Sequence, residues 1–157
     1  MIRVVILAVL VVAACSPQPA TSQGTMAELD GAFEFDRLEV INDSGERLEF
    51  AVYLAKTDEQ RRRGLMFVRN MPEQTGMLFI YDGEDIHSMW MKNTYIPLDI
   101  VFALGDGSVS SVISDTVPLS LRSLASREPV QFVLELNAGS ARRFGIGRDS
   151  RIIWSDD

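Results

Sequence analysis

The sequence predicts an α+β fold that is mainly β: a small antiparallel barrel-like sheet with one or two short helices. From Phe33 onward, short runs of β-branched, aromatic and aliphatic residues alternate with Asn, Asp, Gly and Ser, which form turns. Only two stretches among these runs carry start and stop signals for a helix. Many short strands with few helices are typical of a barrel or sandwich.

The composition indicates one domain and argues against one class of partner. The chain has 157 residues, 46% of them hydrophobic and 24% charged, as in an ordinary globular protein. The net charge is −7. Nonspecific binding to nucleic acid depends on clustered cations, so no nucleic-acid partner is expected.

The first fifteen residues are typical of a secretory signal. Arg3 precedes the apolar run Val4–Val12, which is too short to cross a bilayer. The run ends in Val-Ala-Ala-Cys, which resembles the lipobox of bacterial lipoproteins, so residues 1–15 are a predicted signal peptide with Cys15 as lipid acceptor. The resemblance implies export and a lipid anchor in the cell envelope. Ser16 after the cysteine favours the outer membrane, facing the periplasm.

A linker and the first predicted elements follow. Residues 16–32 are rich in Pro, Ser and Gly and lack apolar periodicity, so they are a predicted flexible linker to a single β-rich domain over residues 33–157. Residues 38–41 and 48–54 predict a hairpin around the turn at 42–45. Thr57 and Gln60 match a capping box, which predicts a helix that ends at Gly64.

The remaining elements are mostly strands. The predicted strands cover residues 76–81, 87–92, 98–104, 108–113, 130–136 and 151–154. Asp106-Gly107 predicts a tight hairpin turn. Asn137 is expected to cap a short second helix that runs through Phe144 and ends at Gly145.

Several motifs together resemble one known family. These are Arg-Gly-Leu-Met at 63–66, Gly-Met-Leu-Phe at 76–79, the stretch from His87 to Phe102 and Val-Leu-Glu-Leu at 133–136. In order and spacing they are similar to domain of unknown function 192 (DUF192). The resemblance implies a β-rich domain, often exported in bacteria, with no established activity.

The strand predicted at 87–92 has two faces, and one is typical of a small ligand site. Strand alternation places Ser88, Trp90 and Lys92 together, next to a polar turn. An arginine cluster at the end of the first helix can bind an anionic group. The ligand-binding candidates are Trp90, Lys92, Asn93, Thr94, Asp99 and Arg63. Alternatively, Trp90 is a core residue, Asn93 and Thr94 bond their own backbone within the turn, and Asp99 pairs with Lys92 or an arginine.

The opposite face of the same strand predicts metal binding as an alternative function. His87, Met89 and Met91 offer an imidazole and two thioethers, which suit Cu(I). Packing alone can also account for the methionines. A third alternative is an enzyme that uses His87 with Asp99 or Glu135 as acid and base. The sequence has no nucleophile motif, so an enzyme is less expected than a ligand-binding or accessory module.

These interpretations predict the following partners. The membrane is reached through the lipid on Cys15, and the domain is expected to bind a small anionic ligand or another envelope protein. No cofactor is expected.

Overall fold

The computed structural model describes Met26 and residues 29–155. The predicted signal peptide, Cys15 and residues 16–25, 27 and 28 of the predicted linker lie outside the described residues. Leu29 is fully buried, so the ordered packing begins within the last residues assigned to the linker.

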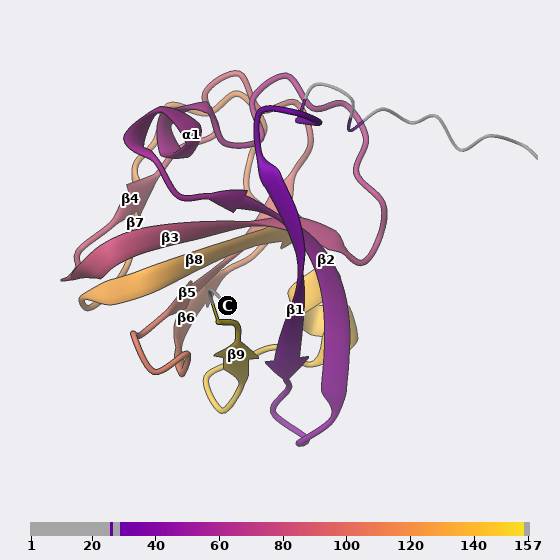
Figure 1. Ribbon diagram of the computed structural model, residues 1–157, viewed down its shortest axis with the longest axis vertical. Coiled ribbons are helices and arrows are strands. Elements are labelled where there is room, and N and C mark those ends of the chain that lie inside the picture. The colour runs from indigo at the N-terminus through magenta and orange to yellow at the C-terminus, as the bar shows by residue number, and fades with distance from the viewer. Residues whose placement is uncertain (1–25, 27–28, 156–157) are drawn as a thin grey trace, which may run out of the picture.

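A curled seven-stranded sheet forms the body of the described chain (Figure 1). Its strand order is β6-β5-β8-β3-β2-β1-β9, and a separate two-stranded sheet pairs β4 with β7. The elements are β1 (Glu34–Ile41), β2 (Arg47–Ala55), α1 (Asp58–Arg63), β3 (Thr75–Asp85), β4 (Ser88–Met89), β5 (Leu98–Ala103), β6 (Val109–Ile113), β7 (Leu124–Ala125), β8 (Val130–Asn137), α2 (Ser140–Phe144) and β9 (Arg151–Ile153). The predicted mainly β fold with two short helices is confirmed.

The first hairpin and the crossover after it follow from local sequence signals. β1 and β2 pair antiparallel, and the Asn42 side chain accepts the backbone N–H groups of Ser44 and Glu46 within the turn. β2 then pairs with β3 in parallel, the one departure from an antiparallel sheet among the described strands, and α1 lies in the crossover between them. The capping box of Thr57 and Gln60 is present as predicted.

Two predicted elements are wrong in detail. The strand expected at 87–92 is regular only at Ser88–Met89, because the Met91 N–H donates to the Ser120 carbonyl of a neighbouring loop. Asn137 does not cap the second helix. It is the last residue of β8, and its side-chain amide donates to the Met71 carbonyl, while Gly139 is the helix N-cap.

The hydrophobic core consists of one cluster on each face of the sheet. On one face, Phe79, Ile100 and Val133 pack with the residues that follow α1. On the other face, Leu134 and Leu136 of β8 pack with residues of α2 and β9. Neighbouring residues of β8 therefore face opposite clusters.

The two edges of the large sheet approach each other. The Ile152 N–H of β9 donates to the Gly107 carbonyl at 2.8 Å, and Val109 of β6 donates to the Ser150 carbonyl at 3.0 Å. Gly107 has φ +84°, and a Cβ on it would lie 2.1 Å from the Ile152 carbonyl oxygen. Only glycine allows the edges to meet at this point.

Candidate functional site

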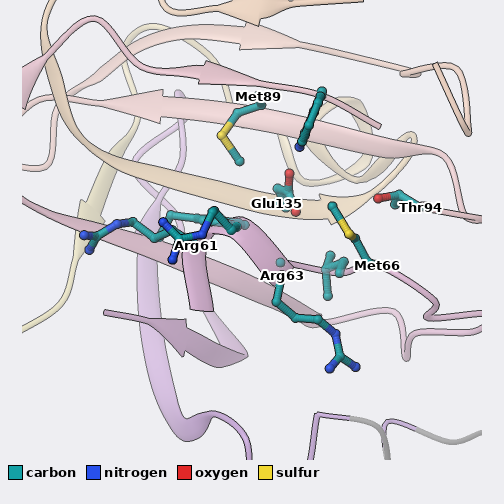
Figure 2. Close-up of a pocket in the computed structure, with 11 residues that line it drawn as sticks. Arg61, Arg63, Met66, Met89, Thr94 and Glu135 are labelled. Atoms are coloured by element: carbon teal, nitrogen blue, oxygen red, sulfur yellow. The ribbon is translucent and has the colours of Figure 1, made fainter. Parts of the chain in front are cut away.

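A small cavity opens where the end of α1, the end of β4 and the inner part of β8 meet (Figure 2). Its volume is about 20 Å³, which is room for one water molecule or an ion of similar size. The lining residues are Arg61, Arg62, Arg63, Gly64, Leu65, Met66, Phe79, Met89, Trp90, Thr94 and Glu135. We call this site the Glu135 pocket.

Glu135 is the only carboxylic acid among the residues that line this pocket. It lies in β8 between Leu134 and Leu136, and alternation turns it toward the opposite face from theirs. It is 4% exposed, and within the described part of the chain no group donates a hydrogen bond to its carboxyl oxygens. Burial raises the pKa of Glu135 to about 8. The side chain is therefore mostly neutral at pH 7 when the pocket holds no cation.

The arginines at the rim do not neutralise Glu135. Arg61 donates to the backbone carbonyls of Lys56, at 2.5 Å, and Ile80, at 2.7 Å. It also pairs with Asp58. Figure 2 shows that the side chains of Arg61 and Arg63 extend away from the Glu135 carboxyl group. Arg61 instead connects the start of α1 with β3.

Two loops bring the thioether of Met66 to the pocket. The Phe67 N–H donates to the Asn93 carbonyl at 2.8 Å, which fixes the loop after α1 against the turn at 91–94. The Asn93 side-chain amide then contacts the Met66 sulfur at 3.8 Å. At the start of this connection, a Cβ on Gly64 would lie 3.2 Å from the Phe79 ring. The glycine lets the helix end settle directly on β3.

Tyr81 connects the pocket with His87. Its hydroxyl lies 3.9 Å from the Met89 sulfur, and its ring stacks on the His87 ring with a centroid distance of 3.4 Å. Burial raises the pKa of Tyr81. The positive charge of Arg61 partly opposes this increase, and the nearby Glu135 adds to it. Burial lowers the pKa of His87, so the imidazole favours its neutral form. Its Nε2 is buried and has no hydrogen-bond partner within the described residues.

Some of the predicted ligand-binding residues meet at this pocket and others do not. Trp90, Thr94 and Arg63 line it. Lys92 lies outside, with its ammonium group 4.9 Å from the centre of the Trp90 ring. Asn93 acts through Met66, as described above. Trp90 is 47% exposed, so it lies at the rim and is not a core residue.

Asp99 lies elsewhere. It is fully buried, and it accepts the Ala141 N–H of α2 at 2.8 Å and the Asp115 N–H at 2.9 Å. Those bonds place it on the face of the second core cluster, whereas His87 stacks on Tyr81 of the first. The expected acid–base pair of His87 and Asp99 is not assembled.

The expected copper ligands are also separated. Met91 is 1% exposed and packs in the first core cluster, so strand alternation placed it correctly inward but not at the pocket. Met89 lines the pocket, and the second thioether there is that of Met66. Within the described residues, no three His, Cys, Asp or Glu side chains gather as a metal site. None of the described helices is long and apolar enough to span a membrane.

Glu135 is the pocket residue that sequence reasoning undervalued. The sequence suggests it only as an acid–base partner for His87. The available signal is a single charged residue within the apolar run Val-Leu-Glu-Leu of a strand that is buried on both faces.

Comparisons with known proteins give a family and two solved relatives. The DUF192 family model, described as an uncharacterized ACR, matches residues 39–154. A protein from Sinorhizobium meliloti 1021, named for a proposed role as transcription regulator, is 40% identical with a TM-score of 0.75 and covers 77% of this chain and 94% of its own. A protein of unknown function from Novosphingobium aromaticivorans DSM 12444 is 34% identical with a TM-score of 0.75, over 79% and 88%. No curated protein matches the chain.

Proposed function

The chain belongs to the DUF192 family, and within that family we propose that it is an exported, lipid-anchored envelope protein whose domain binds a small cationic group in the Glu135 pocket. A single observation carries the binding proposal. A carboxyl group that is only 4% exposed, with no hydrogen bond from any described group, opens into a cavity of about 20 Å³. Buried acids without a partner are unfavourable and concentrate at functional sites.

The size and chemistry of the pocket favour a small cationic group, either a metal ion or the ammonium end of a ligand. A cavity of about 20 Å³ admits an ammonium group or a metal ion. Glu135 supplies a carboxylate once a cation is present, and the exposed Trp90 ring at the rim can contact the rest of a cationic ligand. This proposal departs from the anionic ligand expected from the sequence, because the buried acid Glu135 faces the cavity and Arg61 is already bonded to backbone carbonyls and Asp58.

Cu(I) is the second candidate for the bound cation, and a specific observation favours it. Met66 and Met89 both line the pocket beside Glu135. Thioethers are ligands that select Cu(I). The copper hypothesis therefore continues with Met66 in place of Met91. His87 is linked to this set only through the ring of Tyr81, which also contacts the Met89 sulfur.

The binding test uses proton release. Residues 26–155 contain every described element and both core clusters, so a chain that begins at Ser16 keeps all described contacts. Titration of this chain at pH 7 with methylammonium, and separately with Cu(I), is followed by calorimetry in buffers of different ionisation enthalpy. Glu135 is mostly protonated before binding, so a cation should release close to one proton per site.

Matched variants assign the source of the signal. Glu135→Gln should abolish both heat and proton release for either probe. Met66→Leu should weaken Cu(I) alone, whereas Met71→Leu, which changes a buried methionine outside the pocket, should leave both probes unchanged. If neither probe binds, or if proton release persists in Glu135→Gln, the pocket is not a cation site.

The anchor and the location are a separate part of the proposal. The support is the apolar run Val4–Val12 that ends in Val-Ala-Ala-Cys, followed by Ser16. Cys15→Ser should move the protein from the membrane fraction to the soluble fraction and prevent incorporation of labelled fatty acid. Identical fractionation of both proteins would contradict the anchor and leave the pocket untouched.

A further inference from the structure

Three segments that lie together carry a concentration of positive charge. They are residues 61–72, 88–98 and 116–124, which we call the basic loop face. They contain Arg61, Arg62, Arg63, Arg69, Lys92 and Arg122, which are six of the 15 Lys and Arg of the chain, and none of its 22 Asp and Glu. In a protein with a net charge of −7, this separation of charge marks one end of the molecule as different.

The same face exposes apolar side chains. Nine large hydrophobic residues are exposed in the part of the chain that the structure describes, and six of them belong to the basic loop face. These six are Phe67, Trp90, Tyr95, Val117, Leu119 and Leu121, with exposed fractions from 37% to 71%. Contiguous apolar exposure of this kind marks a surface that meets a partner or a membrane.

Backbone hydrogen bonds hold the three segments together. The Phe67 N–H donates to the Asn93 carbonyl at 2.8 Å, and the Leu119 N–H donates to the Thr94 carbonyl at 3.1 Å. The Phe67 and Tyr95 rings meet edge to face at 6.2 Å. The apolar residues thus form one surface.

Two of the exposed residues are held in an unfavourable backbone conformation. Phe67 has φ 71° and Leu119 has φ 62°, which place both residues in the left-handed region of backbone conformation. Large apolar residues rarely adopt this conformation. Their side chains are nevertheless 42% and 56% exposed. Core packing does not explain a strained backbone that directs an apolar side chain toward solvent. Such strain is typical of functional loops.

The cations lie beside the aromatic rings. The Lys92 ammonium is 4.9 Å from the Trp90 ring centre, and the Arg69 guanidinium is 4.6 Å from that of Tyr95. Trp and Tyr prefer the boundary between lipid headgroups and acyl chains, and nearby cations attract anionic headgroups. This combination fits an anionic bilayer, in which aromatic rings and aliphatic loop tips such as Leu121 enter the boundary region while the cations meet the headgroups.

The N-terminal end of the described chain is on the same side. The Gln60 side chain of α1 donates to the Ala32 carbonyl at 3.0 Å, and Figure 1 shows the indigo start of β1 at the end where α1 and the loops lie. Residues 16–28 separate Cys15 from Leu29 and can span at most ~45 Å. A lipid on Cys15 would hold this end within that distance of the bilayer.

From these observations we infer that the basic loop face docks on an anionic lipid bilayer, with the apolar loop tips at the level of the headgroups and the cations against them. The position of the N-terminus supports this inference through the lipid anchor proposed above. The charge, the apolar exposure and the strain do not depend on it.

The test uses the chain that begins at Ser16, which has no lipid acceptor, so failure of the docking face and failure of the anchor are distinguishable. Sedimentation with phosphatidylcholine vesicles is compared with and without phosphatidylglycerol, at low and high salt. Binding should require the anionic lipid and weaken with salt.

A matched pair of double variants locates the binding surface. Lys92→Gln with Leu121→Ser should weaken partitioning at least ~10-fold, since each cation at an anionic surface contributes roughly fivefold and an apolar tip adds to it. Arg148→Gln with Ile153→Ser removes an exposed cation and an exposed apolar residue outside this face and should change little. No binding to anionic vesicles would overturn the inference, and an acidic protein partner would then be the occupant to seek. An equal loss in both double variants would also overturn it.

Discussion

Glu135→Gln should stabilise the protein at neutral and alkaline pH. Burial raises the pKa of Glu135 from 4.5 to about 8. Between these two values the native state holds a proton that the unfolded state has lost. The free energy of unfolding of the wild type is therefore not reduced by Glu135 below pH 4.5, and it falls as the pH rises from 4.5 toward 8.

The magnitude follows from the size of the pKa shift. Each pH unit within the window costs about 1.4 kcal/mol, so the wild type loses about 3 kcal/mol between pH 4.5 and 7 and between 4 and 5 kcal/mol by pH 8. Gln has the same shape as the neutral acid and cannot ionise. The variant should therefore match the wild type below pH 4.5 and exceed its free energy of unfolding by about 3 kcal/mol at pH 7.

Urea unfolding below pH 4.5, at pH 7 and above pH 8 measures this difference, with tryptophan fluorescence as the probe. Glu59→Gln, which changes an exposed carboxylate of α1, is the control and should run parallel to the wild type at all three values. If the difference between Glu135→Gln and the wild type is the same at every pH, Glu135 is not a buried neutral acid. The argument for a cation pocket would then fail with it.

Three further substitutions test the description of the fold, each by the free energy of unfolding. Arg61→Gln should lower the free energy of unfolding by about 1.5 to 3 kcal/mol, because the Arg61 guanidinium donates to two backbone carbonyls. Arg62 is exposed, so Arg62→Gln should change it by no more than about 0.5 kcal/mol. Equal losses in the two variants would contradict the hydrogen bonds described for Arg61. Asn93→Gly should be neutral or stabilising and Asn93→Ala destabilising by about 1 kcal/mol, since φ is 56°, and the reverse order would show that the turn is not left-handed. Asp99→Ala should cost about 2 to 4 kcal/mol by leaving two backbone N–H groups unsatisfied, and a loss below about 1 kcal/mol would contradict the observed bonds.

The fold was largely predictable because its signals are local. The capping box at Thr57, the turn at Asn42 and the glycine after α2 act within a few residues, and each is present. The family resemblance drawn from the sequence motifs is confirmed as well. The parallel pairing of β2 with β3 was not predicted, since it depends on a crossover whose ends meet only in three dimensions.

The site was predictable only in part, for a related reason. Alternation correctly placed Met89 and Met91 inward and Trp90 and Lys92 outward, although only two residues of that segment are strand. Asp99 was misplaced, because the sequence does not reveal which face of the sheet α2 covers. The raised pKa of Glu135 arises from burial by segments distant in the chain, which no spacing rule reports.

The meeting of β9 with both β1 and the turn at Gly107 determines when the molecule can be completed during synthesis. One edge of β1 pairs only with β9, which lies more than a hundred residues later in the described chain, since Glu39 pairs with Ile153. Ribosomes add about 5 to 20 residues per second, so the nascent chain spends seconds with an open sheet edge. Pairings between distant residues also form slowly. If the chain is exported as an extended polypeptide, as proposed above, it gains time from this order of events, because the strand that completes the sheet is made last.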